Sequence, residues 1–183
     1  MSEEVIVDNC SPTLAGIKTG NLFTVKITDK TDILREIREL NCELGSKGIR
    51  VIPMKRTKDS ALIYLYRPKN LKEDLKDPRA LKLLRKRGYS YESPERLIVQ
   101  LIRRLKEDES FPHEIGLFLG YPPSDVTCFI EHPCKGVKCC GCWKAFSKPE
   151  KAKKIFKRFN MCTRAYKEMS RKGKSLQQLT VPL

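Results

Sequence analysis

The sequence predicts an α+β fold, with a small antiparallel sheet of about three strands covered by helices and a helical C-terminal half. Two observations predict it. Two runs of β-branched and aromatic residues, 49–54 and 61–66, are separated only by the polar segment 55–60, which favours a hairpin. From residue 78 onward, apolar residues instead recur three or four positions apart, the spacing of amphipathic helices.

The N-terminal part supplies a further strand and two helices. Ser11 is the expected N-cap and Pro12 the first residue of a short helix that stops near residues 19–21. Residues 23–27 alternate as in a strand. A second helix, ended by Gly45 or Gly48, is predicted by the apolar residues Ile33, Ile37, Leu40 and Leu44. We expect the helices to cover one face of the sheet.

The C-terminal half reads as a series of helices. Their predicted positions are 78–87, a second opened by residues 93–95, a short apolar one from 111–114 to Gly120, one around 126–130, and a long one after the cysteine-rich stretch. The apolar face of the long helix is Ala152, Ile155, Phe156, Phe159, Cys162, Tyr166 and Met169. We expect residues 1–133 to form the α+β core and residues 134–183 to form a cysteine-rich loop and a long basic helix on the same domain.

The cellular compartment of the protein determines how its cysteines are interpreted. No apolar run approaches the roughly 18–20 residues needed to span a bilayer. The acidic start, residues 1–4, has no apolar segment after it, so no secretory signal is expected. We therefore expect a cytoplasmic protein. In a reducing cytosol, 8 cysteines indicate ligands, redox thiols or small buried residues, and with 2 histidines any metal site would be rich in sulfur.

A cysteine-rich run near the C-terminus is the main candidate for chemistry. Cys139 and Cys142 form a C-x-x-C pair with Cys140 between them, and Cys134 precedes them, so the order C-x4-C-x2-C matches the ligand spacing of plant-type ferredoxins. Cys162 lies further on as a possible additional ligand, although its place on an apolar helix face also suits packing.

Several interpretations of this run stay open. It suits an iron–sulfur cluster, a structural zinc site, or metal-free thiols that carry sulfur or cycle between dithiol and disulfide. The remaining interpretation is that these thiols are incidental and carry no chemistry. Our leading hypothesis is a thiolate-rich redox or iron–sulfur protein whose basic surface steers an acidic redox partner, such as a flavodoxin or ferredoxin.

A small enzyme built on Cys10, His113 and Glu114 is another hypothesis. Cys10 precedes the expected N-cap, where the helix dipole lowers a thiol pKa and favours a nucleophile or ligand, though a packing role fits equally well. His113 and Glu114 suit acid–base chemistry. Sequence neighbours do not face each other on a helix, however, and a Glu there commonly offsets the helix dipole.

The basic C-terminus suggests a third class of function. The net charge is +15, and between Lys135 and Lys174 there are 14 Lys and Arg against Glu150 and Glu168, a local balance of +12. Such a surface attracts nucleic acid or an acidic protein. Stacking partners for bases would be Trp143, Phe146 and Tyr166, but no known nucleic-acid-binding motif accompanies them.

Four segments resemble an uncharacterised, mainly clostridial bacterial family, domain of unknown function 3793. They are residues 10–23, residues 65–68, the block Pro-His-Glu-Ile-Gly-Leu-Phe-Leu-Gly-Tyr-Pro-Pro at 112–123 with the Asp-Val pair after it, and residues 139–144 ending in Gly-Cys-Trp-Lys. The resemblance covers nearly the whole chain. It implies no activity, cofactor or catalytic residue.

Overall fold

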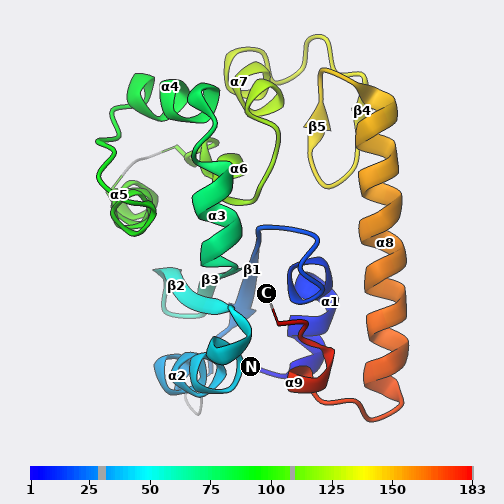
Figure 1. Ribbon diagram of the computed structural model, residues 1–183. Coiled ribbons are helices and arrows are strands. Elements are labelled where there is room, and N and C mark those ends of the chain that lie inside the picture. The colour runs from blue at the N-terminus through cyan, green and yellow to red at the C-terminus, as the bar shows by residue number, and fades with distance from the viewer. Residues whose placement is uncertain (29–31, 108–109, 183) are drawn as a thin grey trace. The chain divides into compact units, whose positions relative to one another are not determined.

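A three-stranded antiparallel sheet with helices confirms the predicted α+β fold (Figure 1). The computed structural model describes residues 1–28, 32–107 and 110–182. The chain divides into two units: unit 1 is Met1–Asn70 with Phe159–Leu183, and unit 2 is Leu71–Arg158. The expected boundary between residues 133 and 134 coincides with neither border, because the cysteine-rich loop and the start of the long helix belong with the preceding helices in unit 2.

The sheet of unit 1 consists of β1 (Gly20–Lys26), β2 (Arg50–Arg56) and β3 (Ser60–Tyr66) in the order β1-β3-β2. Both pairs are antiparallel, which confirms the predicted hairpin and the strand before it. β3 is central and almost wholly apolar, as suits a strand in which consecutive side chains are largely buried. The register shifts between Pro53 and Lys55 on β2, an edge strand, where a proline costs no ladder hydrogen bond.

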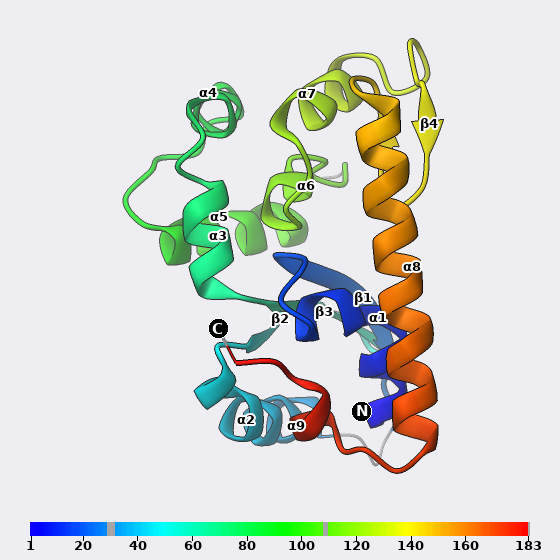
Figure 2. The same cartoon turned by 45° about the vertical axis from the view of Figure 1, so that its right-hand side comes forward.

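Helices of unit 1 cover one face of this sheet (Figure 2). They are α1 (Glu3–Leu14), α2 (Ile33–Leu44), the short α9 (Leu176–Leu179) and the last part of α8 (Pro149–Arg171). A 3-10 turn, Gly45–Lys47, follows α2. The predicted apolar face of α2 is buried in the shared core, and the carboxylate of Asp32 caps the helix by accepting the N–H of Arg35 at 3.1 Å.

The first helix begins nine residues earlier than predicted, at Glu3 and not at Pro12. Ser2, not Ser11, is the N-cap and accepts the N–H of Val5 at 3.4 Å. Ser11 and Pro12 lie near the helix end, where the Ser11 hydroxyl donates to the carbonyl of Val7. The Ser-Pro pair imitates a helix start, but the helix is set by an apolar face that buries Ile6, Val7, Cys10 and Leu14.

Arg67 ties together distant parts of unit 1. Its side chain is fully buried, and its guanidinium donates to the carbonyls of Thr13 (2.6 Å), Leu14 (2.6 Å), Lys47 (3.0 Å) and Val181 (2.7 Å). The N–H of Val181 returns a bond to the carbonyl of Leu14 at 3.0 Å. The buried charge is therefore solvated by backbone dipoles, and burial lowers its pKa.

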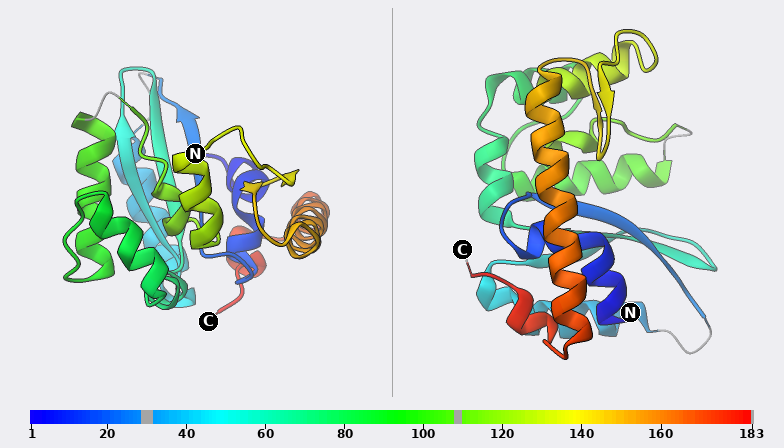
Figure 3. Two further views of the ribbon diagram at one scale, coloured as in Figure 1. Left: turned by 90° about the horizontal axis from the view of Figure 1, so that it is seen from above. Right: turned by 90° about the vertical axis from the view of Figure 1, so that its right-hand side faces the viewer.

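Unit 2 is mainly helical, as predicted. Its elements are the end of α3 (Pro68–Asp74), α4 (Pro78–Lys86), α5 (Pro94–Glu107), α6 (Ile115–Phe118), α7 (Pro123–Glu131), β4 (Cys139–Cys140), β5 (Lys144–Ala145) and the start of α8. The helix α3 and the two-stranded β4–β5 hairpin were not predicted. Figure 3 shows α8 as one uninterrupted helix with residues in both units.

Within the described ranges, no helix has the length and apolar character needed to cross a membrane.

Candidate functional site

Unit 2 contains a cavity of about 400 Å³, here called the hairpin pocket. Three neighbouring segments line it. The first is α6 with the residues before it, including His113 and Gly116, and the second is α7 with its preceding turn. The third is the β4–β5 hairpin, which contributes Cys140, Gly141, Trp143 and Lys144.

Aromatic rings form much of the pocket wall. Tyr121 and Trp143 stack with ring centroids 5.1 Å apart and an angle of 30° between their planes. On another side, the ring of His113 meets Phe129 edge to face, with 5.0 Å between centroids. Burial, aided by the nearby thiol of Cys142, raises the pKa of Tyr121 to about 12, so its phenol stays neutral at physiological pH. The Tyr121 side of the wall is therefore an aromatic ring with a neutral phenol.

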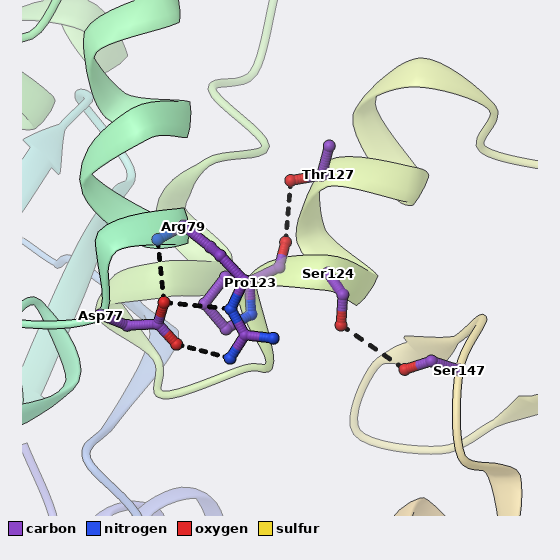
Figure 4. Close-up of polar contacts among 6 residues, drawn as sticks. All are labelled: Asp77, Arg79, Pro123, Ser124, Thr127 and Ser147. Carbon is purple, nitrogen blue, oxygen red and sulfur yellow. Dashed lines mark hydrogen bonds and ion pairs between the residues drawn. The ribbon is translucent and has the colours of Figure 1, made fainter.

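Asp125 anchors the hairpin to α7. Its side chain is buried, and one carboxylate oxygen accepts the indole N–H of Trp143 at 2.9 Å. The other oxygen accepts the backbone N–H of Phe146 at 3.1 Å and both the N–H and the hydroxyl of Ser147 at 3.0 Å. Ser124, at the start of α7, adds a hydroxyl contact to Ser147 at 3.5 Å (Figure 4). The carboxylate of Asp125 therefore holds Trp143 and the residues after β5 in position beside α7.

Gly141 lets the hairpin approach α8 closely. A Cβ atom at this position would lie 2.3 Å from the ring of Phe156, so a larger residue would force that ring to move. Phe156 in turn packs edge-on against Trp143, with 4.5 Å between ring centroids. Gly141, between Cys140 and Cys142, thus allows the β4–β5 hairpin to lie against the Phe156 ring.

Lys144 and Cys140 bring polar chemistry to the apolar lining. They sit opposite each other in the β4–β5 pair. The ammonium of Lys144 donates to the carbonyl of Pro133 at 3.0 Å and lies 5.4 Å from the centroid of the Phe129 ring. Cys140 and His113 are both solvent-exposed at the pocket. One cation, one thiol and one imidazole therefore border the cavity.

The predicted metal ligands occupy different environments. Cys139 and Cys140 form β4, and the half-buried Cys139 thiol contacts the carbonyl of Pro149 at 3.8 Å. Cys134 and Cys142 are exposed, whereas Cys162 belongs to unit 1 and packs against its core. Among the residues that the structure describes, no three His, Cys, Asp or Glu side chains are arranged to hold a metal ion. Iron–sulfur and zinc binding stay predictions.

The predicted setting of Cys10 is wrong. Cys10 lies well inside α1, fully buried in the core of unit 1, and not at a helix N-terminus. Burial raises the pKa of its thiol well above the ordinary range, with Lys18 opposing the shift only weakly. The thiol is consequently neutral, and it belongs to a different unit from His113 and Glu114.

His113 and Glu114 face different environments. Glu114 is fully buried, and one of its oxygens accepts the hydroxyl of Tyr89 at 2.9 Å. Its carboxylate also lies 3.5 Å from the guanidinium of Arg87 and 4.0 Å from that of Arg104. His113 instead lines the hairpin pocket. The two therefore do not form an acid–base pair.

The comparison with family models identifies the chain. The model described as "Protein of unknown function (DUF3793)" matches residues 6–180. The chain belongs to this family. Searches of curated proteins and of solved structures each found no match. In this DUF3793 protein, two of the four segments that carry the family resemblance, 112–123 and 139–144, line the same cavity.

Sequence reasoning missed the residues that hold this DUF3793 pocket together. Tyr121 and Asp125 stand in or beside the most specific sequence block, which was the one available signal, and neither was singled out for a role. Phe129 was read only as an apolar helix residue. Their roles depend on contacts with residues 15–22 positions away, which no local pattern reveals.

Proposed function

We propose that unit 2 binds a small, flat, largely apolar organic molecule in the hairpin pocket. The observation that carries the proposal is the convergence of two separate sequence motifs, 112–123 and 139–144, on one cavity of about 400 Å³. An apolar cavity with a few convergent polar groups is the usual form of a ligand site, and sites commonly measure roughly 300–1,000 Å³. The stacked Tyr121–Trp143 pair offers a wall on which a planar ring can lie.

The single tryptophan of the chain makes this proposal directly testable. Because Trp143 is the only tryptophan, its indole N–H gives one signal in a ¹H–¹⁵N NMR spectrum. We expect flat aromatic fragments to shift that signal and the substitution Phe129→Leu to weaken their binding. Tyr91→Leu, at an exposed aromatic residue outside the lining, is the matched control and should bind like the wild type. If a fragment library leaves the indole signal in place, the proposal fails.

A second proposal is thiol redox chemistry at the β4–β5 hairpin. One observation favours it: Cys140 and Cys142 are exposed on the same short hairpin that carries Cys139, and Cys140 also borders the pocket. Exposed thiols are accessible to thiol–disulfide exchange with a partner. An acidic electron carrier of the flavodoxin or ferredoxin kind would suit the basic surface.

Metal content separates the versions of this second proposal. Anaerobically purified protein that is brown and contains iron supports a cluster held by the hairpin thiols. Stoichiometric zinc supports a structural site instead. Colourless protein without iron, even after reconstitution, excludes the cluster, and metal-free thiol exchange is then tested by the loss of disulfide reactivity in the variant Cys140→Ser with Cys42→Ser as control.

A further inference from the structure

We infer that the ligand of the hairpin pocket is an aromatic carboxylate whose acidic group pairs with Lys144. The inference rests on the proposed function, since it names the class of molecule that the same pocket selects. Three features carry it: a cation held in one place, an acidic neighbour whose oxygens already accept hydrogen bonds from other groups, and an aromatic wall.

The ammonium of Lys144 is held at the pocket border from two sides. It donates to the carbonyl of Pro133 at 3.0 Å, and it lies over the face of the Phe129 ring at 5.4 Å from the centroid. An ammonium has three N–H donors, and the carbonyl accepts one of them. In the part of the chain that the structure describes, no carboxylate pairs with Lys144. The cation is therefore positioned and has donors for an anionic ligand.

Asp125 is the acidic residue of the described lining, and its oxygens are already engaged. They accept hydrogen bonds from the indole of Trp143 and from Phe146 and Ser147. Those donors hold the carboxylate in place, and it forms no ion pair with Lys144. Of the two charged groups of the described lining, Lys144 is therefore the one with hydrogen-bonding capacity left for a ligand, and its donors suit an anionic group.

The ring of Phe129 lies beside Lys144 and beside a second nitrogen-bearing side chain, His113. His113 meets the Phe129 ring edge to face at 5.0 Å, and the ammonium of Lys144 lies over that ring. Both groups therefore flank one ring on the pocket lining, and both can donate to a carboxylate. The described lining contains one lysine and no arginine, which suits a singly charged carboxylate better than a phosphate with its two charges.

The wall formed by Tyr121 and Trp143 selects the other part of the ligand. Two rings stacked at 5.1 Å present a flat surface, and aromatic rings gain additional attraction from such offset stacking. An aliphatic acid would bury less surface on it. The combination of this wall with Lys144 points to a planar ring system that bears a carboxylate.

Three probes separate charge from ring, and the two naphthalene probes are matched in size. They are 2-naphthoate, the neutral 2-naphthalenemethanol, and cyclohexanecarboxylate, titrated into the full chain with the Trp143 indole signal as readout. We expect 2-naphthoate to bind about tenfold more tightly than the alcohol, because hydrogen bonds to charged groups are stronger than neutral ones. Cyclohexanecarboxylate should bind more weakly than 2-naphthoate.

Variants of Lys144 then assign the charge. Lys144→Gln should weaken 2-naphthoate by about tenfold and leave 2-naphthalenemethanol unchanged. Lys144→Arg should restore the preference for the anion. Lys151→Gln, at an exposed lysine of α8 outside the lining, is the matched control and should change neither affinity. The Trp143 signal of each unliganded variant checks that the hairpin is folded.

The outcomes distinguish the two proposals. Equal binding of 2-naphthoate and the alcohol, or equal weakening of both by Lys144→Gln, would overturn the carboxylate inference while the pocket remains a ligand site. Tighter binding of cyclohexanecarboxylate than of 2-naphthoate would overturn the aromatic part. If none of the three probes moves the indole signal, both the inference and the proposed function are wrong.

Discussion

Two buried residues, Cys10 and Glu114, show how environment decides what a side chain can do. Both were candidates for catalysis because of their residue type and expected place at a helix start. The structure encloses each of them completely. Cys10 is surrounded by apolar side chains, and Glu114 by Tyr89, Arg87 and Arg104. Burial makes the first inert and commits the second to holding unit 2 together.

Cys10 should be unreactive in the folded protein. Burial raises its pKa, so the thiol stays neutral, and the thiolate is the nucleophile. Its contribution to stability is present below the ordinary thiol pKa of about 8.5 and is lost as the pH rises above that value, because only the unfolded chain then releases the proton. We predict that iodoacetamide at pH 8 labels the exposed Cys42 and Cys140 in native protein, and labels Cys10 only after unfolding, as mass spectrometry of peptides would show. Labelling of native Cys10 would restore it as a candidate nucleophile.

Glu114→Gln should strongly destabilise the protein. The substitution removes the charge that faces Arg87 and Arg104 and weakens the hydrogen bond from Tyr89. Because the two arginine side chains are 38% and 27% exposed, we expect a loss of about 1.5–3 kcal/mol, the range for hydrogen bonds to charged groups. Chemical denaturation measures the change. Glu131→Gln is the control, since Glu131 forms an exposed pair with Lys86 that is worth about 1 kcal/mol or less. Similar losses of unfolding free energy for both variants would mean that the contacts of Glu114 stabilise the protein no more than an exposed ion pair does.

At the level of elements, periodicity predicts those whose partners are close in sequence. The helices α2 and α5 and the β2–β3 hairpin follow from apolar spacing and turn position alone. The start of α1 was misplaced because the Ser-Pro pair carries a helix-start signal at what is structurally a helix end. The β4–β5 hairpin could not be predicted, because its two-residue strands depend on Asp125, about 20 residues earlier.

Asp125→Asn should loosen the β4–β5 hairpin while α7 stays folded. An amide has one acceptor oxygen in place of two, so it cannot accept from Trp143 and from Phe146 and Ser147 at once. We predict faster hydrogen exchange at the backbone amides of Phe146 and Ser147 and a shifted Trp143 indole signal. Ser124→Ala, which removes only the 3.5 Å hydroxyl contact, should have a much smaller effect. An unchanged exchange rate in Asp125→Asn would show that the hairpin is held by other contacts.

At the level of the whole molecule, the long helix α8 has a buried apolar face and an exposed basic surface, as its sequence predicts. The apolar face of α8 is buried at Ala152, Phe156, Phe159 and Tyr166, as its spacing predicts. The basic side chains of the helix fall largely on its exposed surface, among them Lys151, Lys153, Lys154, Lys157, Arg158, Arg164 and Arg171. Tyr166 and Phe146 are both buried, which removes two of the three aromatic residues suggested for stacking on bases.

Nucleic-acid binding by α8 predicts a strong dependence on salt. Each phosphate contact releases counterions, so affinity for duplex DNA or RNA should fall steeply between about 50 and 200 mM salt. A mobility-shift assay at these two concentrations measures it, and Lys154→Glu together with Arg158→Glu should weaken binding at the lower one. Glu150→Gln, which removes a negative charge from the same helix, should not weaken it. Absence of any shift at low salt would eliminate this alternative.

The division of the chain also sets the order in which the protein can be completed during translation. Unit 2 is an insertion within unit 1, entered in α3 and left in α8. A ribosome therefore releases all of residues 71–158 before the last part of unit 1 emerges, and domains generally fold as units as they are made. Until Val181 arrives, the buried guanidinium of Arg67 lacks one of its four carbonyl partners. Residues 159–183 therefore complete unit 1 only after all of unit 2 has been synthesised.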